Sequence, residues 1–181
     1  GGIVGAGIVR DAAMRGLKVG LVEQGDFASG TSSRSSRMLH GGIRYLAQGN
    51  IRLVRQASLE KRIVSRIATH ISAPLPFIFP TYRNTPWPKW KLSVGVKLYD
   101  LLCSGKNLGK SGSFNREKTK NLLRGINDKK LTGSVRYFDG ATSDARLVMD
   151  TLRSGTRHKG RIVNYAKLVD IERQGECCQG S

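Results

Sequence analysis

The hydrophobic and polar positions of residues 1–22 predict a helix followed by a buried strand. A helix is expected over residues 8–15, and Gly16 is expected to end it because glycine readily adopts the left-handed conformation that follows many helices. Residues 18–22 form a near-continuous apolar run, which is typical of a strand covered on both faces of a parallel sheet. This order predicts an α/β fold at the start of the chain.

Downstream, apolar residues recur at helical spacing in three longer stretches. Residues 51–69 place apolar side chains every three or four positions between arginines and lysines, which predicts an amphipathic helix with Asn50 as its N-cap. Further helices are expected over residues 87–102 and 143–156. Residues 73–80 carry prolines near both ends, which favours a short extended segment.

The remaining segments carry weaker patterns. Residues 104–130 are polar, basic and contain glycine, so a loop with one short helix over residues 116–123 is predicted. Strands are expected over residues 161–165 and 167–172, whereas residues 174–181 have no interpretable pattern. The sequence contains no internal repeat and no apolar run long enough to predict a membrane span.

The chain carries a large positive charge. Its 31 lysine and arginine residues and 13 acidic residues give a formal net charge of +18 over 181 residues, and the excess is concentrated in residues 83–136. A run of this kind usually marks a solvated surface, and attraction to anionic lipid head groups is the functional alternative. No block of residues forms a recognised nucleic-acid-binding module, so nucleic acid is not predicted as a partner.

The cysteines give no sign of a metal site. Cys103, Cys177 and Cys178 lack C-x-x-C or other metal-ligand spacing. Adjacent cysteines rarely form a structural bridge, and the pattern suits a reducing compartment.

The first residues, GGIVGAG, carry the clearest candidate chemistry. A dinucleotide-binding fingerprint has the pattern G-x-G-x-x-G between a strand and a helix, with an acid about 20 residues further on. Gly2 and Gly5 match its second and third glycines, so its first glycine and strand would precede residue 1. Gly2 would admit a pyrophosphate, Gly5 would let the helix pack against the strand, and the amides near Ala6 would face the phosphates.

An acid follows this motif at the expected place. Glu23 ends the predicted strand and can accept hydrogen bonds from both ribose hydroxyls, which disfavours the 2′-phosphate of NADP. The alternative is that the glycines only mark turns, since 22 of the 181 residues are glycine. The motif alone does not distinguish FAD from NAD.

The next segment, residues 25–46, is rich in hydroxyl groups and glycine. Its serine and threonine side chains suit a phosphate and a ribityl chain, and its two adjacent glycines would bring bare backbone against a flat ring. A cation and a phenol follow at once. A flexible serine-rich loop is the alternative. The candidate cofactor contacts here are Thr31, Ser32, Ser35, Leu39, His40, Gly41 and Gly42, and the candidate catalytic residues are Arg44 and Tyr45.

These two segments together resemble the N-terminal region of the FAD-dependent glycerol-3-phosphate dehydrogenases. That family carries a GGGxxGxGxxRDAAxRG start, an acid after the second strand, and a TSSxSSKLxHGGxRYL block. The block matches residues 31–46, with Arg37 in place of the usual lysine. Residues 137–140 and 143–148 resemble the family's Y-x-D-G and D-D-A-R-L-V, with Ser143 in place of the first aspartate. The resemblance covers residues 1–173.

The resemblance implies an α/β fold with two parts: an incomplete Rossmann-like FAD-binding domain and the start of an α+β substrate domain. Residues 1–72 would begin the FAD-binding domain, residues 73–140 would belong to the substrate domain, and residues 141–181 would return to the FAD-binding domain. In this interpretation the backbone at Val169 borders the adenine of FAD. The family's main phosphate-binding cations and base would lie beyond residue 181, so we expect the chain alone to be inactive.

The resemblance also implies a reaction. Sn-glycerol 3-phosphate would be oxidised to dihydroxyacetone phosphate, with hydride passing to N5 of FAD and electrons passing on to the quinone pool. Arg44 would hold the substrate anion or stabilise the developing alkoxide, and Tyr45 would line the same pocket; a supporting structural role is the alternative for both. His40 would border the flavin ring rather than act as a base.

The implied partners are glycerol 3-phosphate, quinone, an anionic membrane surface and a second copy of the chain. The implied location is peripheral, on the cytoplasmic side of the membrane or at the mitochondrial inner membrane. Trp87 and Trp90 beside Lys89 and Lys91 are typical of an interfacial anchor, and packing of both rings inside the substrate domain is the alternative.

Three other functions stay open. A glycerol-3-phosphate oxidase shares the N-terminal pattern but passes electrons to oxygen. An amino-acid oxidase of the same flavin superfamily is disfavoured by the Arg44 and Tyr45 context and by the match over residues 137–148. A non-catalytic basic module that binds membrane or nucleic acid is the alternative outside enzymes.

Overall fold

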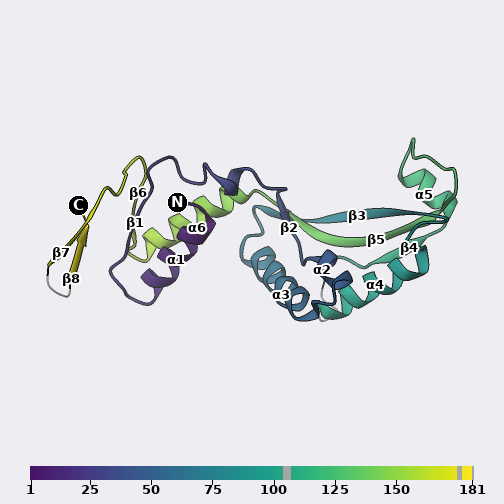
Figure 1. The fold of residues 1–181 in the computed structure, drawn as a ribbon, viewed down its shortest axis with the longest axis horizontal. Coiled ribbons are helices and arrows are strands. Elements are labelled where there is room, and N and C mark those ends of the chain that lie inside the picture. The colour runs from purple at the N-terminus through teal and green to yellow at the C-terminus, as the bar shows by residue number, and fades with distance from the viewer. Residues whose placement is uncertain (104–106, 175–176, 181) are drawn as a thin grey trace. The chain divides into compact units, whose positions relative to one another are not determined.

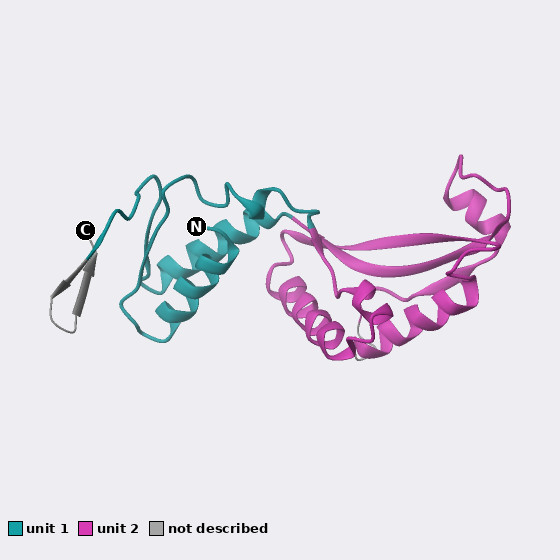
Figure 2. Cartoon of the chain, in the orientation of Figure 1, with its two compact units in different colours: residues 1–37, 143–181 teal, residues 38–142 magenta. Residues whose placement is uncertain are grey.

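The computed structural model (Figure 1) describes residues 1–103, 107–174 and 177–180, with the backbone alone from residue 172 onward. The chain divides into two compact units, residues 1–37 with 143–181 and residues 38–142 (Figure 2). The functional domains predicted from the sequence, 1–72, 73–140 and 141–181, stay a prediction. Residues 38–72 pack with residues 73–142 in the second unit.

The first unit pairs two helices with a short parallel ribbon of strands. Helices α1 (Ile3–Met14) and α6 (Asp144–Arg157) lie side by side (Figure 1), and β1 (Gly20–Val22) pairs in parallel with β6 (Arg161–Val163). A short 3₁₀ helix, η1 (Thr31–Ser33), also belongs to this unit. The α/β class is confirmed. The core residues of the unit are Ala6, Val9, Ala28, Val148 and Leu152.

The end of α1 confirms the prediction, but its beginning corrects it. The helix begins at Ile3 rather than at residue 8, because the small residues that resembled a loop continue the helix from its N-cap, Gly2. Gly16 follows the helix with φ of +79°. Its N–H donates to the carbonyl of Ala13 at 3.0 Å, and the next N–H, that of residue 17, donates to the carbonyl of residue 12 at 3.1 Å. These two bonds form the Schellman motif that glycine favours.

The strands of the first unit are shorter than expected. The predicted strand over residues 18–22 begins at Gly20, and that over 161–165 ends at Val163. Residues 167–170 are not a strand, which corrects the prediction for 167–172. The chain becomes extended at β7 (Ile171–Gln174), which pairs antiparallel with β8 (Cys177–Gly180).

The second unit is built on an antiparallel sheet around β5 (Leu131–Thr142). Strand β3 (Ser72–Tyr82) pairs with β5 along its whole length, while β2 (Met38–Leu39) and β4 (Gly112–Phe114) pair with parts of β5. The extended segment over 73–80 is confirmed and is longer than predicted. Strands β2, β4 and β5 were not predicted.

The prolines of β3 explain why this strand pairs on one side in the described part of the chain. Pro74, Pro76 and Pro80 are all at even positions, and alternate residues of a strand direct their N–H groups to opposite sides. The N–H of Arg83, an odd position, donates to the carbonyl of Lys130 at the start of β5. The prolines therefore occupy the positions whose N–H would point away from β5, where proline is tolerated.

Helices cover one face of this sheet. Figure 1 shows α2 (Ile43–Ala47), α3 (Ile51–Ile67) and α4 (Lys89–Leu102) along that face, and α5 (Arg116–Leu122) at one end. The helices expected over 51–69, 87–102 and 116–123 are confirmed, whereas α2 was not predicted. The side chain of Asn50 accepts from the N–H of Leu53 at 3.3 Å, which confirms the N-cap. No helix in the described ranges is both long and apolar enough to cross a bilayer.

The end of α1 gives a first test of the fold. Replacing Gly16 with alanine should lower the free energy of unfolding by about 1 kcal/mol, because an L side chain is strained at positive φ. Asparagine, which tolerates this conformation, should cost less at the same position. Urea unfolding of the full-length protein and both variants measures the difference, and equal losses for alanine and asparagine would contradict the assigned conformation.

Candidate functional site

The turn that opens α1 leaves backbone amides available. The N–H of Ile3 donates to the hydroxyl of Ser32 at 3.2 Å, and a Cβ at Gly2 would lie 3.3 Å from the same oxygen. Gly2 caps the helix without a side-chain hydrogen bond. The N–H groups of Val4 and Gly5 have no acceptor in the part of the chain that the structure describes. Such a helix start, with free amides and the positive end of the dipole, favours an anion such as a phosphate.

The glycines of this turn lie against their neighbours. A Cβ at Gly1 would lie 2.8 Å from Cγ of Glu23 and 2.9 Å from Cδ1 of Phe27, so no side chain fits there. A Cβ at Gly5 would lie 3.3 Å from Cδ1 of Leu21, which is on β1. The absence of side chains therefore brings the turn close to the end of β1.

Glu23 follows β1 directly, and the turn after it holds its side chain. Its Oε1 accepts from the N–H of Gly25 at 2.9 Å. This hydrogen bond is the largest cause that lowers the pKa of Glu23. Its backbone carbonyl accepts from the N–H of Ala166 at 3.0 Å. A carboxylate beside a glycine turn and a helix start is the arrangement that binds the ribose and pyrophosphate of a dinucleotide in Rossmann-like folds.

The other predicted cofactor residues of this unit are placed differently. The hydroxyl of Ser35 bonds to the carboxylate of Asp144 at the start of α6, and Thr31 is exposed at the start of η1. The side chain of Ala6 is buried in the core, and its N–H is bonded to the carbonyl of the helix cap. Val169 is 75% exposed. The structure thus brings Ser32 to the glycine turn and directs Ser35 toward α6.

The segment that follows β2 is fixed by close contact at Gly41. Leu39 ends β2, His40 is exposed, and Gly41 is buried. The N–H of Gly41 donates to Oη of Tyr99 at 3.0 Å. A Cβ at Gly41 would lie 2.2 Å from that oxygen and 2.5 Å from Oγ of Ser58, so only glycine fits here.

The two predicted catalytic residues, Arg44 and Tyr45, have different surroundings. Gly42 has φ of +71°, and a Cβ there would lie 2.7 Å from Cδ2 of Tyr45. The ring of Tyr45 therefore lies over Gly42. Arg44 instead borders a cavity of about 610 Å³ within the second unit, together with Lys91. The rest of its lining is largely apolar and includes Ile43, Phe79, Trp87, Leu92, Val135 and Tyr137.

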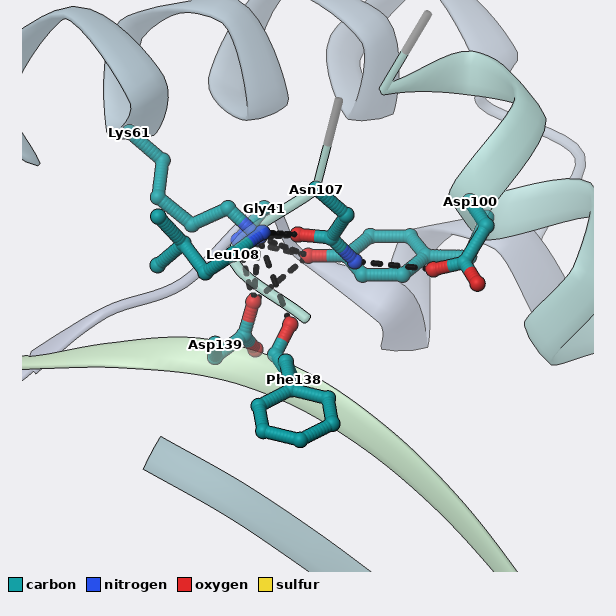
Figure 3. Close-up of polar contacts among 8 residues, drawn as sticks. Gly41, Lys61, Asp100, Asn107, Leu108, Phe138 and Asp139 are labelled. Carbon is teal, nitrogen blue, oxygen red and sulfur yellow. Dashed lines mark hydrogen bonds and ion pairs between the residues drawn. The ribbon is translucent and has the colours of Figure 1, made fainter. Parts of the chain in front are cut away.

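A buried polar cluster lies behind Gly41 (Figure 3), and the sequence analysis missed it. The side chains of Lys61 and Asp139 are each 2% exposed and form an ion pair of 2.9 Å. Tyr99 donates to the same carboxylate oxygen at 2.6 Å. A signal was present, because Lys61 continues the stripe of Val54 and Ser58 on the buried face of α3 at helical spacing.

With this geometry in view, comparison with known proteins defines the class. The family described as FAD dependent oxidoreductase matches residues 1–181, and the chain belongs to this family. The predicted FAD-binding fold and the FAD cofactor are thereby confirmed. The roles of the individual site residues stay predictions.

Several relatives within this class share one name. The chain is 42% identical over 178 residues to "Glycerol-3-phosphate dehydrogenase 2" of Mycobacterium tuberculosis, covering 97% of this chain and 30% of that protein. It is 37% identical over 181 residues to the mitochondrial glycerol-3-phosphate dehydrogenase of Homo sapiens, covering 94% and 24%. The chain therefore spans about a quarter to a third of the length of these relatives, and the resemblance to this enzyme family is confirmed.

Two solved structures share the fold. The glycerol-3-phosphate dehydrogenase from Bacillus halodurans, complexed with FAD, matches with a TM-score of 0.67 and 26% identity, over 96% of this chain and 27% of that chain. The L-alpha-glycerophosphate oxidase from Mycoplasma pneumoniae, with FAD bound, matches with a TM-score of 0.68 and 17% identity, over 97% and 45%. At that identity the second likeness shows the fold alone.

The carboxylate at the end of β1 can be tested directly. Replacing Glu23 with alanine in the full-length protein should weaken FAD binding about tenfold or more, because hydrogen bonds to a charged group contribute about 1.5–3 kcal/mol. Titration of the deflavinated protein with FAD measures the affinity. Glu60→Ala, at an exposed glutamate of α3, is the matched control. Equal affinity of the Glu23 variant and the wild type would exclude the ribose role.

Proposed function

We propose that the full-length protein oxidises sn-glycerol 3-phosphate to dihydroxyacetone phosphate and passes the electrons to quinone. The observation that carries the proposal is the 37–42% identity, over nearly the whole chain, to proteins named glycerol-3-phosphate dehydrogenase. The glycine turn and Glu23 support a bound FAD. The match of residues 31–46 to the family block supports glycerol 3-phosphate as the substrate.

The residues of this chain have separate roles in the proposal. Gly2, Gly5 and Glu23 would hold the adenosine diphosphate half of FAD, and the resemblance over residues 31–46 assigns residues 39–42 to its ring. When bound, FAD accepts the hydride that leaves C2 of the substrate. Arg44 supplies a permanent positive charge that holds the substrate phosphate or stabilises the alkoxide that forms at C2. Arg44 and Lys91 are the two cationic side chains of an otherwise largely apolar cavity, so an anion there would meet these two residues.

Quinone is the acceptor that the resemblance over residues 1–46 implies, and it stays a prediction. Oxygen is the alternative acceptor, and the same assay tests both.

An anionic membrane surface is part of the same proposal. Trp90 on α4 is 70% exposed, and Nζ of Lys91 lies 4.9 Å from the ring centroid of Trp87 just before the helix. Exposed indoles beside lysines suit the head-group region of a bilayer, where the ring and the charge each find a favourable partner. This supports a peripheral location, on the cytoplasmic side of the membrane or at the mitochondrial inner membrane, near the quinone pool.

The activity gives the decisive experiment. The purified full-length protein should be yellow, with flavin absorbance at about 450 nm. It should reduce a soluble quinone analogue when glycerol 3-phosphate is added in the absence of oxygen. A colourless protein that takes up no FAD would contradict the proposal. Oxygen consumption without quinone reduction would instead identify an oxidase, and binding of DNA or lipid without FAD would favour a non-catalytic basic module.

Arg44 should affect turnover rather than cofactor content. Arg44→Ala should lower kcat/KM for glycerol 3-phosphate by about a hundredfold, the usual effect of removing one donor to a developing or fixed negative charge. Flavin content should stay at the wild-type level. Arg52→Ala, at an exposed arginine of α3, is the matched control. Wild-type turnover in the Arg44 variant would remove this residue from the site.

A further inference from the structure

The buried cluster behind Gly41 is a connected set of charged and polar groups. Lys61 Nζ lies 2.9 Å from Oδ1 of Asp139, 3.2 Å from Oη of Tyr99 and 2.9 Å from Oδ1 of Asn107. It also donates to the carbonyl of Phe138 at 3.4 Å. A buried ion pair of this kind is weak evidence for stability, because desolvation opposes the attraction between the charges. Its presence therefore calls for a role beyond stabilisation.

The cluster converges on one backbone group. The N–H of Gly41 faces two acceptors, Oη of Tyr99 at 3.0 Å and Oδ1 of Asp139 at 3.3 Å. Tyr99 in turn donates its hydroxyl proton to Asp139. Burial, followed by the nearby charge of Asp139, raises the pKa of Tyr99, so its hydroxyl keeps the proton that it donates. Gly41 is thus held by a tyrosine whose orientation is itself fixed.

The cluster is anchored to several elements of the second unit. Lys61 comes from α3, Tyr99 from α4 and Asp139 from β5. Asn107 extends it to α4 again, because its side chain donates to Asp100 at 2.8 Å. In Figure 3 the polar ends of Lys61, Asn107 and Asp139 converge from these separate segments beside Gly41. Movement of the turn at Gly41 would therefore disturb its hydrogen bonds to α4 and β5, and through them the contacts of Lys61 on α3.

We propose that Lys61, Tyr99 and Asp139 are positioning residues that fix the backbone of the His40–Gly41–Gly42 turn against the flavin ring. The inference rests on the proposed function, in which this turn lies against the ring. The three residues do not touch the cofactor themselves. They act through the N–H of Gly41, whose missing side chain leaves the space that the Tyr99 hydroxyl occupies.

Tyr99→Phe in the full-length holoenzyme is the sharpest test, because it removes one oxygen and keeps the ring. Amide hydrogen exchange of the peptide that contains Gly41 should become faster by about tenfold or more, since a buried hydrogen bond is lost. The flavin absorption spectrum and reduction potential should shift, because the backbone beside the ring moves. Asp139→Asn should act in the same direction. Tyr82→Phe, on β3 and outside the cluster, should leave all three measurements unchanged.

Two results would overturn the inference. Wild-type exchange at Gly41 in Tyr99→Phe would show that the cluster does not hold the turn. Faster exchange with an unchanged flavin spectrum and potential would show that the cluster holds the turn without positioning the cofactor. If Asp139→Asn fails to fold, Tyr99→Phe alone decides.

The inference and the proposed function fail in different ways. A wild-type protein that takes up no FAD would overturn the proposed function and the flavin half of the inference. The exchange measurement in that protein would still decide whether the cluster holds the turn. A wild-type enzyme that is yellow and active, with a Tyr99→Phe variant indistinguishable from Tyr82→Phe, would overturn the inference alone.

Discussion

A buried lysine needs a buried acid, and this constraint organises the second unit. Lys61 and Asp139 are almost fully removed from water, so the loss of their hydration is compensated by their ion pair and by surrounding hydrogen bonds. Removing one partner of such a pair costs about 3–5 kcal/mol, because the other charge is left uncompensated. The pair also fixes register: Asp139 lies opposite Leu75 of β3, and a shift by one residue would direct its carboxylate to the other face of the sheet.

The first unit depends on a different constraint, the close approach of backbones. A Cβ at Gly155 of α6 would lie 3.5 Å from Cα of Arg10 on α1, and Ala6 and Ala13 lie on the buried side of α1. Small residues let the two helices approach each other. The same property at Gly1 and at the cap of α1 brings Glu23 beside the helix start. Close packing and the candidate nucleotide site therefore have one cause in the sequence.

Local patterns predicted what local forces determine. The helices α3, α4, α5 and α6 were predicted because each has a clear apolar period or a cap. The end of α1 was predicted because glycine suits the positive φ that Gly16 adopts there. Strand β5 was missed because polar residues on it are satisfied inside the protein, as where Ser134 bonds to Thr119. The cluster at Lys61 was missed because its partner Asp139 lies 78 residues further along the chain, and a local pattern does not show such a contact. The cofactor motif was predictable because its chemistry lies in one short segment.

The positive charges of the chain attract anions in two ways. The proposed membrane surface would be attracted by the long-range field, whereas the proposed substrate phosphate would be bound by direct contact. A net charge of +18 produces a field that attracts any anionic surface, but salt at physiological concentration screens it beyond about 8 Å. Exposed lysines on and around α4 act through that screened field. Arg44 on its cavity would act by direct contact with a phosphate, where its planar guanidinium fixes direction as well as charge. Binding of the membrane should therefore depend strongly on ionic strength, while substrate recognition by Arg44 would depend on the geometry of α2, which begins directly after Gly42.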